Sequence, residues 1–118
     1  MLADDSGLLQ GTVELLVLKT LTWGPMHGYG IAGWIGERTG EALQIEEGSL
    51  YPSLYRMEQK GWIEAEWRIT EKNRRAKYYR LTEEGRRQLS ADASEWARFA
   101  EAVGKVMQGT EAPAWSGS

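Results

Sequence analysis

The chain has 118 residues, of which 42% are hydrophobic and 26% charged, and this composition predicts one folded domain rather than two domains or a disordered chain. It contains no cysteine, which excludes a disulfide-stapled secreted domain and a thiolate metal site. The formal net charge is −3, the first residues are acidic, and no apolar run reaches the roughly twenty residues that a membrane span needs, so we expect a cytoplasmic protein without a membrane partner.

Two helices are predicted in the first third of the chain. Residues 12–22 carry apolar side chains at helical spacing on most sides, which predicts a buried helix that ends before Pro25. Residues 27–38 predict a second helix with large apolar side chains on one face. Each glycine in this helix costs about 1 kcal/mol relative to alanine, so packing must hold the helix in place. A weak short strand is expected at residues 43–45.

The third predicted helix has an apolar stripe, because Leu50, Leu54 and Met57 recur at i, i+4 and i+7. Proline lacks an N–H and is expected in the first turn of a helix, so Pro52 predicts a start with Ser49 or its neighbour as the N-cap. The opposite face suits a reader of the major groove of DNA, and a surface helix with incidental aromatic residues is the alternative. The side chains that project from this opposite face are Pro52, Tyr55, Arg56 and Gln59.

A β-hairpin is predicted next, because residues 62–70 and 77–81 alternate between apolar and polar side chains with period two. Residues 71–75 form the polar connection, in which Asn73 tolerates the left-handed conformation that a turn requires. Three helices followed by a basic hairpin predict a winged helix-turn-helix, with the hairpin as a wing that straddles phosphates. The side chains expected at the tip are Lys72, Arg74 and Arg75.

The net charge conceals a basic segment at this hairpin. Residues 1–47 carry a net charge of −5 and residues 91–118 of −2, whereas residues 48–90 carry +4. Because the field of a surface charge falls off within about one Debye length, roughly 8–10 Å, phosphate binding requires only such a local patch. A solvated charged hairpin is the alternative. Lys77 is expected at a phosphate. Tyr79 alternates with Leu81, which favours an inward side chain with only its hydroxyl reaching a phosphate.

The last predicted helix is longer than one small domain can cover. Thr82 caps its start, and the periodic positions run for about 25 residues, or roughly 37 Å of helix. Its apolar positions step by 4, 3, 4, 3 and 4 residues, as in the seam of a coiled coil: Leu89, Ala93, Trp96, Ala100, Val103 and Met107. A second copy of the chain is the simplest partner, and a two-fold axis then predicts an inverted-repeat DNA site.

Trp96 suggests a ligand site within this seam. It is a large residue among alanines, and alanine opposite tryptophan can leave a flat gap between two subunits. Our hypothesis is that planar aromatic ligands stack on Trp96 and Phe99 and change the spacing of the two reading helices. A tryptophan that simply fills the interface is the alternative.

No enzyme, metal or cofactor site is predicted. His27 has no second ligand nearby in the sequence, so a metal ion is not expected. The pair Glu46 and Glu47 lies beside a helix N-terminus and complements its dipole, and the sequence indicates no pocket in which these carboxylates could act as a catalytic pair.

Three motifs, MHGYGI at residues 26–31, GSLYPSLYRMEQKG at 48–61 and RAKYYRLTEEG at 75–85, resemble those of the PadR-type transcription regulators. The resemblance extends over roughly residues 8–108. It implies a winged-helix dimer that usually represses transcription, binds a palindromic operator, and in some members releases DNA on binding an aromatic or drug-like ligand. It places His27 near the DNA backbone and puts DNA-facing roles on Ser49, Tyr51, Pro52, Tyr55, Arg56, Arg74, Arg75, Lys77 and Tyr79.

The sequence departs from the family pattern at Gly30, where a longer polar residue is commoner, and it lacks the separate C-terminal helical domain of long members. We therefore predict a short-form, mainly α protein with a small β-hairpin wing (α+β class). The expected parts are a winged helix-turn-helix domain at residues 8–82, a C-terminal dimerisation helix at 83–108 and a disordered tail at 109–118. The expected function is repression by sequence-specific binding of double-stranded DNA, and a winged-helix module that binds protein is the alternative.

Overall fold

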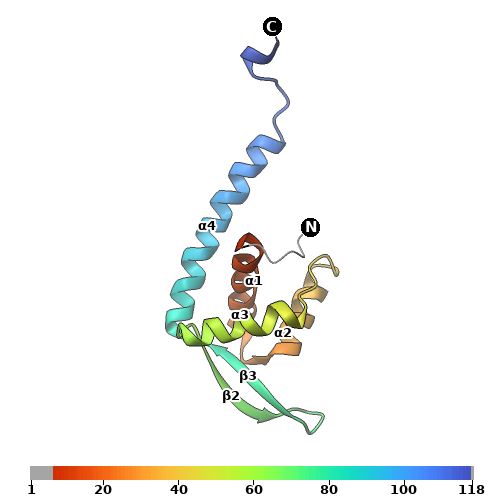
Figure 1. Ribbon diagram of the computed structural model, residues 1–118, viewed down its shortest axis with the longest axis vertical. Helices are drawn as coiled ribbons and strands as arrows, with labels where there is room; N and C mark the ends of the chain where they lie inside the picture. Colours follow the sequence, from red (N-terminus) through yellow and green to blue (C-terminus); the bar gives the residue numbers. More distant parts are fainter. Residues whose placement is uncertain (1–6, 118) are drawn as a thin grey trace.

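The computed structural model describes residues 7–117, with side chains described from residue 11 to residue 115. Its architecture confirms the α+β class with a hairpin wing (Figure 1). The helices are α1 Gly7–Thr20, α2 Gly28–Arg38, α3 Glu47–Gln59 and α4 Glu83–Met107, with 3-10 helices η1 Leu21–Trp23 and η2 Ala114–Gly117. The strands are β1 Met26–His27, β2 Ile63–Ile69 and β3 Arg75–Leu81. The η2 turn lies in the segment for which the sequence predicts a disordered tail.

The first three helices enclose the hydrophobic core. α1 is buried on most sides, as its sequence predicts, but it begins earlier than predicted and passes at Leu21 into η1. Leu50, Leu54 and Met57 are buried, which confirms the inner stripe of α3. Each such side chain contributes about 1.5–3 kcal/mol on burial, which offsets the cost of the glycines in α2. The core also contains Val17, Leu18, Ile31, Ile35 and Ile63.

The sheet has the strand order β1-β3-β2, with both pairs antiparallel. The strand predicted at residues 43–45 is wrong, because this segment has no strand partner and Leu43 and Ile45 instead pack against the core from an irregular loop. The third strand is β1, in which Met26 pairs with Tyr79. β1 therefore ties the start of α2 to the root of the wing.

The start predicted for α3 is also wrong. The helix begins at Glu47 with Glu46 as the N-cap, so that Pro52 lies inside it, one turn beyond the predicted position. Pro52 and Gly48 are both exposed, and water can donate to the Gly48 carbonyl that loses its helical partner at the proline. Glu47 lies in the first turn, where its charge complements the helix dipole.

α4 starts at the root of the wing and leaves the helical head, which gives the molecule a length of 69 Å (Figure 1). The Thr82 hydroxyl accepts a hydrogen bond of 3.0 Å from the Gly85 N–H, which confirms Thr82 as the N-cap. A Cβ atom on Gly85 would lie 2.1 Å from the Trp62 carbonyl oxygen, so only glycine allows this approach to the strand root. None of the described helices combines the length and apolar character that crossing a membrane requires.

Candidate nucleic-acid interface

The open face of α3 carries the two tyrosines that the sequence places there. Tyr51 and Tyr55 are exposed, as is Pro52 between them, whereas Ser49 is half-buried. The core lies on the opposite side of the helix. The N-terminal part of α3 therefore presents a polar and aromatic surface on the side away from the core.

Tyr51 is positioned by a glycine of the neighbouring helix. A Cβ atom on Gly28 would lie 2.6 Å from the Tyr51 hydroxyl oxygen, so the tyrosine ring crosses the start of α2 at a point where no side chain could stand. The sequence shows the glycine, but this contact joins residues of different helices and depends on how α2 and α3 pack.

His27 caps the N-terminus of α2. Its Nδ1 accepts a hydrogen bond of 2.9 Å from the Gly30 N–H, so the neutral ring carries its proton on Nε2. The ring meets Tyr78 edge-on at 5.1 Å and lies 6.4 Å from the exposed Tyr29. Nε2–H remains the donor with which His27 could reach a phosphate. Within the described residues, no group of three or more His, Cys, Asp or Glu side chains is placed to hold a metal ion.

Arg56 is held partly toward the protein. Its Nε lies 3.6 Å from Oε2 of Glu14 in α1, and one of its terminal nitrogens donates to the Ser53 hydroxyl at 3.0 Å. Glu14 is 9% exposed, and its Oε2 accepts no hydrogen bond from the described residues. Arg56 thus connects the reading helix to α1, and its contact with DNA stays a prediction.

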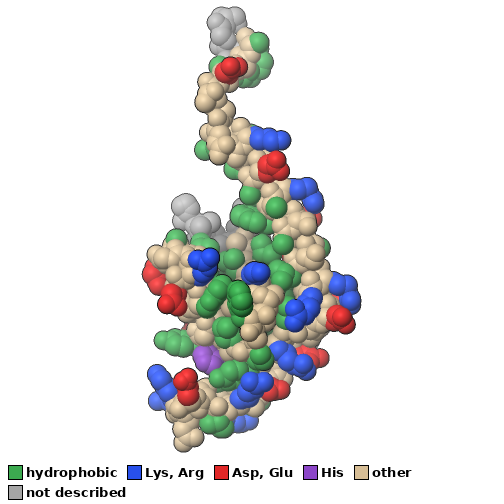
Figure 2. Space-filling view, turned by 180° about the vertical axis from the view of Figure 1, so that it is seen from behind, with side chains coloured by type: hydrophobic (Ala, Val, Ile, Leu, Met, Phe, Trp, Pro, Cys, Tyr) green, Lys and Arg blue, Asp and Glu red, His purple; other side chains and the backbone are tan. Residues whose placement is uncertain are grey.

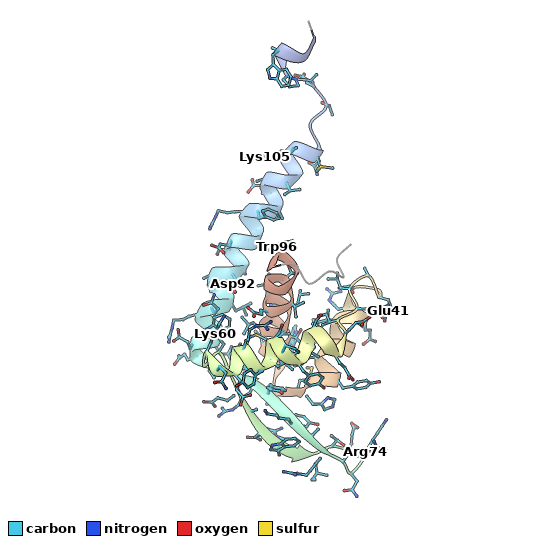
Figure 3. All side chains as sticks on the ribbon, viewed as in Figure 1. Glu41, Lys60, Arg74, Asp92, Trp96 and Lys105 are labelled. Atoms are coloured by element: carbon cyan, nitrogen blue, oxygen red, sulfur yellow. The ribbon has the colours of Figure 1, made fainter. Side chains whose placement is uncertain are left out.

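The wing forms the end of the molecule opposite the C-terminus (Figure 1), and its second strand and turn are rich in basic residues. Asn73 adopts φ 59° in the turn, as predicted, and the Thr70 hydroxyl accepts from the backbone N–H groups of Lys72 and Arg74 at 3.2 Å each. Arg74 projects from the tip (Figure 3). Arg75 follows it at the start of β3 and is likewise exposed. The space-filling view shows Lys and Arg side chains at this end, with acidic side chains beside some of them (Figure 2).

Some basic residues of the hairpin are already paired with carboxylates and are less available to bind phosphates. Arg68 pairs with Glu66 at 2.6 Å and Arg80 pairs with Glu64, both within the sheet. The Lys77 ammonium lies 3.4 Å from the carboxylate of Glu58 in α3. In the part of the chain that the structure describes, Lys72, Arg74 and Arg75 take part in no ion pair, so no carboxylate neutralises these three charges at close range.

Tyr79 packs inward, as its alternation with Leu81 predicts. Its side chain is 5% exposed and belongs to the core, and a contact of its hydroxyl with a phosphate stays a prediction. Burial raises the pKa of the Tyr79 phenol, and the negative charge of Glu58 raises it further. The side chain acts as a support under the wing rather than as a surface group.

The seam predicted along α4 is exposed beyond its first turns. Leu89 packs against the core, whereas the later positions, from Ala93 to Met107, are open along one face of the helix. Trp96 and Phe99 lie together, with ring centroids 6.0 Å apart. α4 therefore presents an apolar face that none of the described residues covers.

A cleft of about 530 Å³ lies between α1 and α4. Glu14 and Leu15 line it from α1, and Asp92, Trp96 and Phe99 line it from α4. Figure 3 shows Asp92 and Trp96 on the stretch of α4 that runs beside α1. The cleft combines two aromatic rings with acidic side chains, and the sequence alone did not predict its acidic lining.

Sequence reasoning also missed two exposed aromatic residues, one at the start of α2 and one on the wing. Tyr29 is 80% exposed beside His27, and Trp67 is 57% exposed on β2. Tyr29 lies off the buried Ile31 and Ile35 stripe, which could have indicated its exposure. The alternation of β2 puts Trp67 on the side of Ile63, which is buried, so the sequence pattern suggested the wrong environment.

Comparisons with known proteins agree with this fold. Residues 17–91 match the family described as "Transcriptional regulator PadR-like family". An uncharacterized protein of Lysinibacillus sphaericus is 33% identical over 106 residues, or 90% of this chain and 97% of that protein.

Solved structures give the same result. A transcriptional regulator from Clostridium thermocellum has 31% sequence identity and a TM-score of 0.76, over 85% of this chain and 97% of that one. A PadR-like transcriptional regulator from Bacillus cereus has 27% identity and a TM-score of 0.74, over 88% and 99% of the two chains. The chain therefore belongs to the PadR-like family of transcriptional regulators, which are DNA-binding proteins rather than enzymes.

Proposed function

We propose that the protein is a dimeric, cytoplasmic repressor that binds an inverted-repeat operator near its own gene. The observation that supports this most directly is the exposed Tyr51 and Tyr55 face of α3, which shares one end of the molecule with the basic wing tip. In this proposal α3 enters the major groove and reads base edges, while Arg74 and Arg75 bind phosphates. His27 donates from Nε2 to the DNA backbone.

The exposed face of α4 supports the dimer. Trp96, Val103 and Met107 are large apolar side chains that are open to solvent in the single chain. Apolar surface on this scale along one helix face is typical of an interface, and the heptad-like spacing fits a second copy of the same helix. A two-fold axis along this face directs both reading helices toward the same side of a DNA duplex.

The cleft between α1 and α4 supports a ligand that relieves repression. The paired rings of Trp96 and Phe99 suit a planar aromatic molecule, and the carboxylates of Asp92 and Glu95 in the lining favour one that carries a positive charge. Such a ligand acts by moving α4 against α1, which changes the distance between the two α3 helices of the dimer. Saturating amounts of planar aromatic cations should quench tryptophan fluorescence and weaken operator binding, and no change in either property contradicts the ligand.

DNA binding across a salt series tests the repressor function. With duplexes from upstream of the gene, we expect the affinity to fall steeply as salt rises, with a slope near 0.9 per phosphate contact on logarithmic axes. The double variant Arg74→Ala/Arg75→Ala should bind weakly and with a shallower slope. The matched control is Arg98→Ala/Lys105→Ala, which removes two exposed cations of α4 and should leave the affinity unchanged. Absent or salt-insensitive binding favours a protein-interaction module instead.

A further inference from the structure

One face of the wing changes along its length from core to open surface. The strand register pairs Ile63 with Leu81 at the root, and Trp67 with Lys77 nearer the tip. Because every second residue of a strand points to the same side, all four side chains share one face of the hairpin. Ile63 and Leu81 are buried, whereas Trp67 is exposed.

Ile69 continues this apolar face beyond Trp67. It is 62% exposed and pairs with Arg75 across the hairpin. No described element covers these two large apolar side chains near the free end of the wing. The single chain therefore does not gain the free energy that their burial would give. The face therefore has the character of a contact surface.

The charges around these two residues indicate what the contact is. The Arg75 guanidinium carbon lies 4.7 Å from the centre of the Trp67 ring, which holds this cation against the apolar face. On the same face Lys77 pairs with Glu58 of α3, so the face adjoins the reading helix. An apolar surface bordered by cations matches the wall of a DNA groove, where apolar deoxyribose rings alternate with phosphates.

We propose that Trp67 and Ile69 pack against the deoxyribose wall of the minor groove that flanks the major groove read by α3. Trp67 contributes apolar contact in its own right and also directs Arg75 to the neighbouring phosphate. This contact rests on the proposed operator binding and adds to it a wing that binds by apolar contact as well as by charge. Apolar side chains are used in this way by other proteins that bind the minor groove.

Operator affinity of Trp67→Ala over a salt series tests this contact. Because an apolar contact releases no counterions, we expect about a tenfold weaker binding at every salt concentration, with the salt slope lowered by less than one phosphate contact. Trp67→Phe should recover part of the loss. On a duplex trimmed by about 5 base pairs at each end, which removes the flanking minor groove, wild type and Trp67→Ala should bind equally.

The controls separate this contact from the proposed function. Trp115→Ala removes another exposed tryptophan at the C-terminal end of the molecule and should bind the full duplex as the wild type does. Thermal unfolding of each variant checks the fold, which should persist because Trp67 is largely exposed. Failure of the wild type to bind any upstream duplex overturns the operator function itself.

Three results overturn the wing contact while leaving operator binding intact. Wild-type affinity in Trp67→Ala removes the contact altogether. If the salt slope of Trp67→Ala is lower than that of the wild type by a full phosphate contact, Trp67 serves only to hold Arg75. If Trp67→Ala binds DNA as the wild type does but no longer sediments with phosphatidylserine vesicles that carry down the wild type, the face binds an anionic membrane surface.

Discussion

Tyr79 places a titrating group inside the core beneath the wing. Burial raises the pKa of its phenol above the usual value, and the negative charge of Glu58 adds to the shift. The unfolded chain loses this proton at about pH 10, whereas the folded protein still holds it there. The free energy of unfolding is therefore at its full value below about pH 10 and falls as the pH rises through the raised pKa.

The variant Tyr79→Phe should weaken this alkaline loss of stability, because phenylalanine has no proton to lose. Urea unfolding measured between about pH 9 and pH 11 gives the dependence directly. Tyr29→Phe serves as the control, since Tyr29 is almost fully exposed. If Tyr79→Phe loses stability above pH 10 as steeply as the wild type does, another group causes the loss.

The environments of single residues were the hardest features to predict. The alternation of the last strand correctly places Tyr79 on the side of Leu81, but it cannot tell how far along the wing the core extends. Arg56 was predicted to face DNA from its position on the helix, and its contact with Glu14 joins residues 42 positions apart in the chain. Such contacts depend on the packing of two helices, which no local pattern contains.

The junction between the wing and α4 depends on one glycine. In Gly85→Ala the new Cβ atom would lie 2.1 Å from the Trp62 carbonyl oxygen, a backbone atom that cannot rotate away. We expect a loss of about 2–3 kcal/mol or more in the free energy of unfolding, since helix and strand root must move apart. Chemical denaturation with circular dichroism measures this loss.

Gly33→Ala is the matched control for this substitution. Gly33 also lies within a helix, but a Cβ atom there would meet nothing within 4 Å. Alanine should stabilise the protein by up to about 1 kcal/mol through its higher helix propensity. Equal effects of the two substitutions would contradict the role assigned to the Trp62 contact.

Whole elements were predicted well where their periodicity extends over several turns. The inner stripe of α3, the turn at Asn73 and the cap at Thr82 follow from local chemistry and are present in the structure. Pro52 misled the prediction of the start of α3, because a proline on the exposed side of a helix costs less than the general rule assumes. β1 has only two residues and exists because β3 lies beside it, so its own sequence carries no signal.

At the scale of the whole molecule, the exposed aromatic and basic end lies far from the open part of α4. The wing and the C-terminal part of α4 occupy opposite ends of a structure 69 Å long (Figure 1). The proposed ligand cleft lies between them, where α1 runs beside α4, and Glu14 both lines this cleft and contacts Arg56 of α3. A ligand that moved Glu14 would therefore act on the reading helix directly as well as through the dimer.

The proposed dimer makes the operator affinity depend on α4, although α4 does not contact DNA in the proposal. Val103→Glu puts a charge into the predicted seam and should convert the dimer into monomers, as analytical ultracentrifugation would show. Since two linked heads bind an inverted repeat with a high effective concentration, the variant should bind the full operator about a hundredfold more weakly or worse. Its affinity for a duplex with a single half-site should equal that of the wild type.

Ser94→Glu provides a control on the same helix. Ser94 is exposed, and because nine residues of an α-helix turn through about 900°, it lies opposite Val103. This variant should remain dimeric and keep its operator affinity. If Val103→Glu also stays dimeric, the interface lies elsewhere and the seam does not align the two DNA-binding domains. If it becomes monomeric with undiminished operator affinity, each head suffices alone and the inverted repeat is not required.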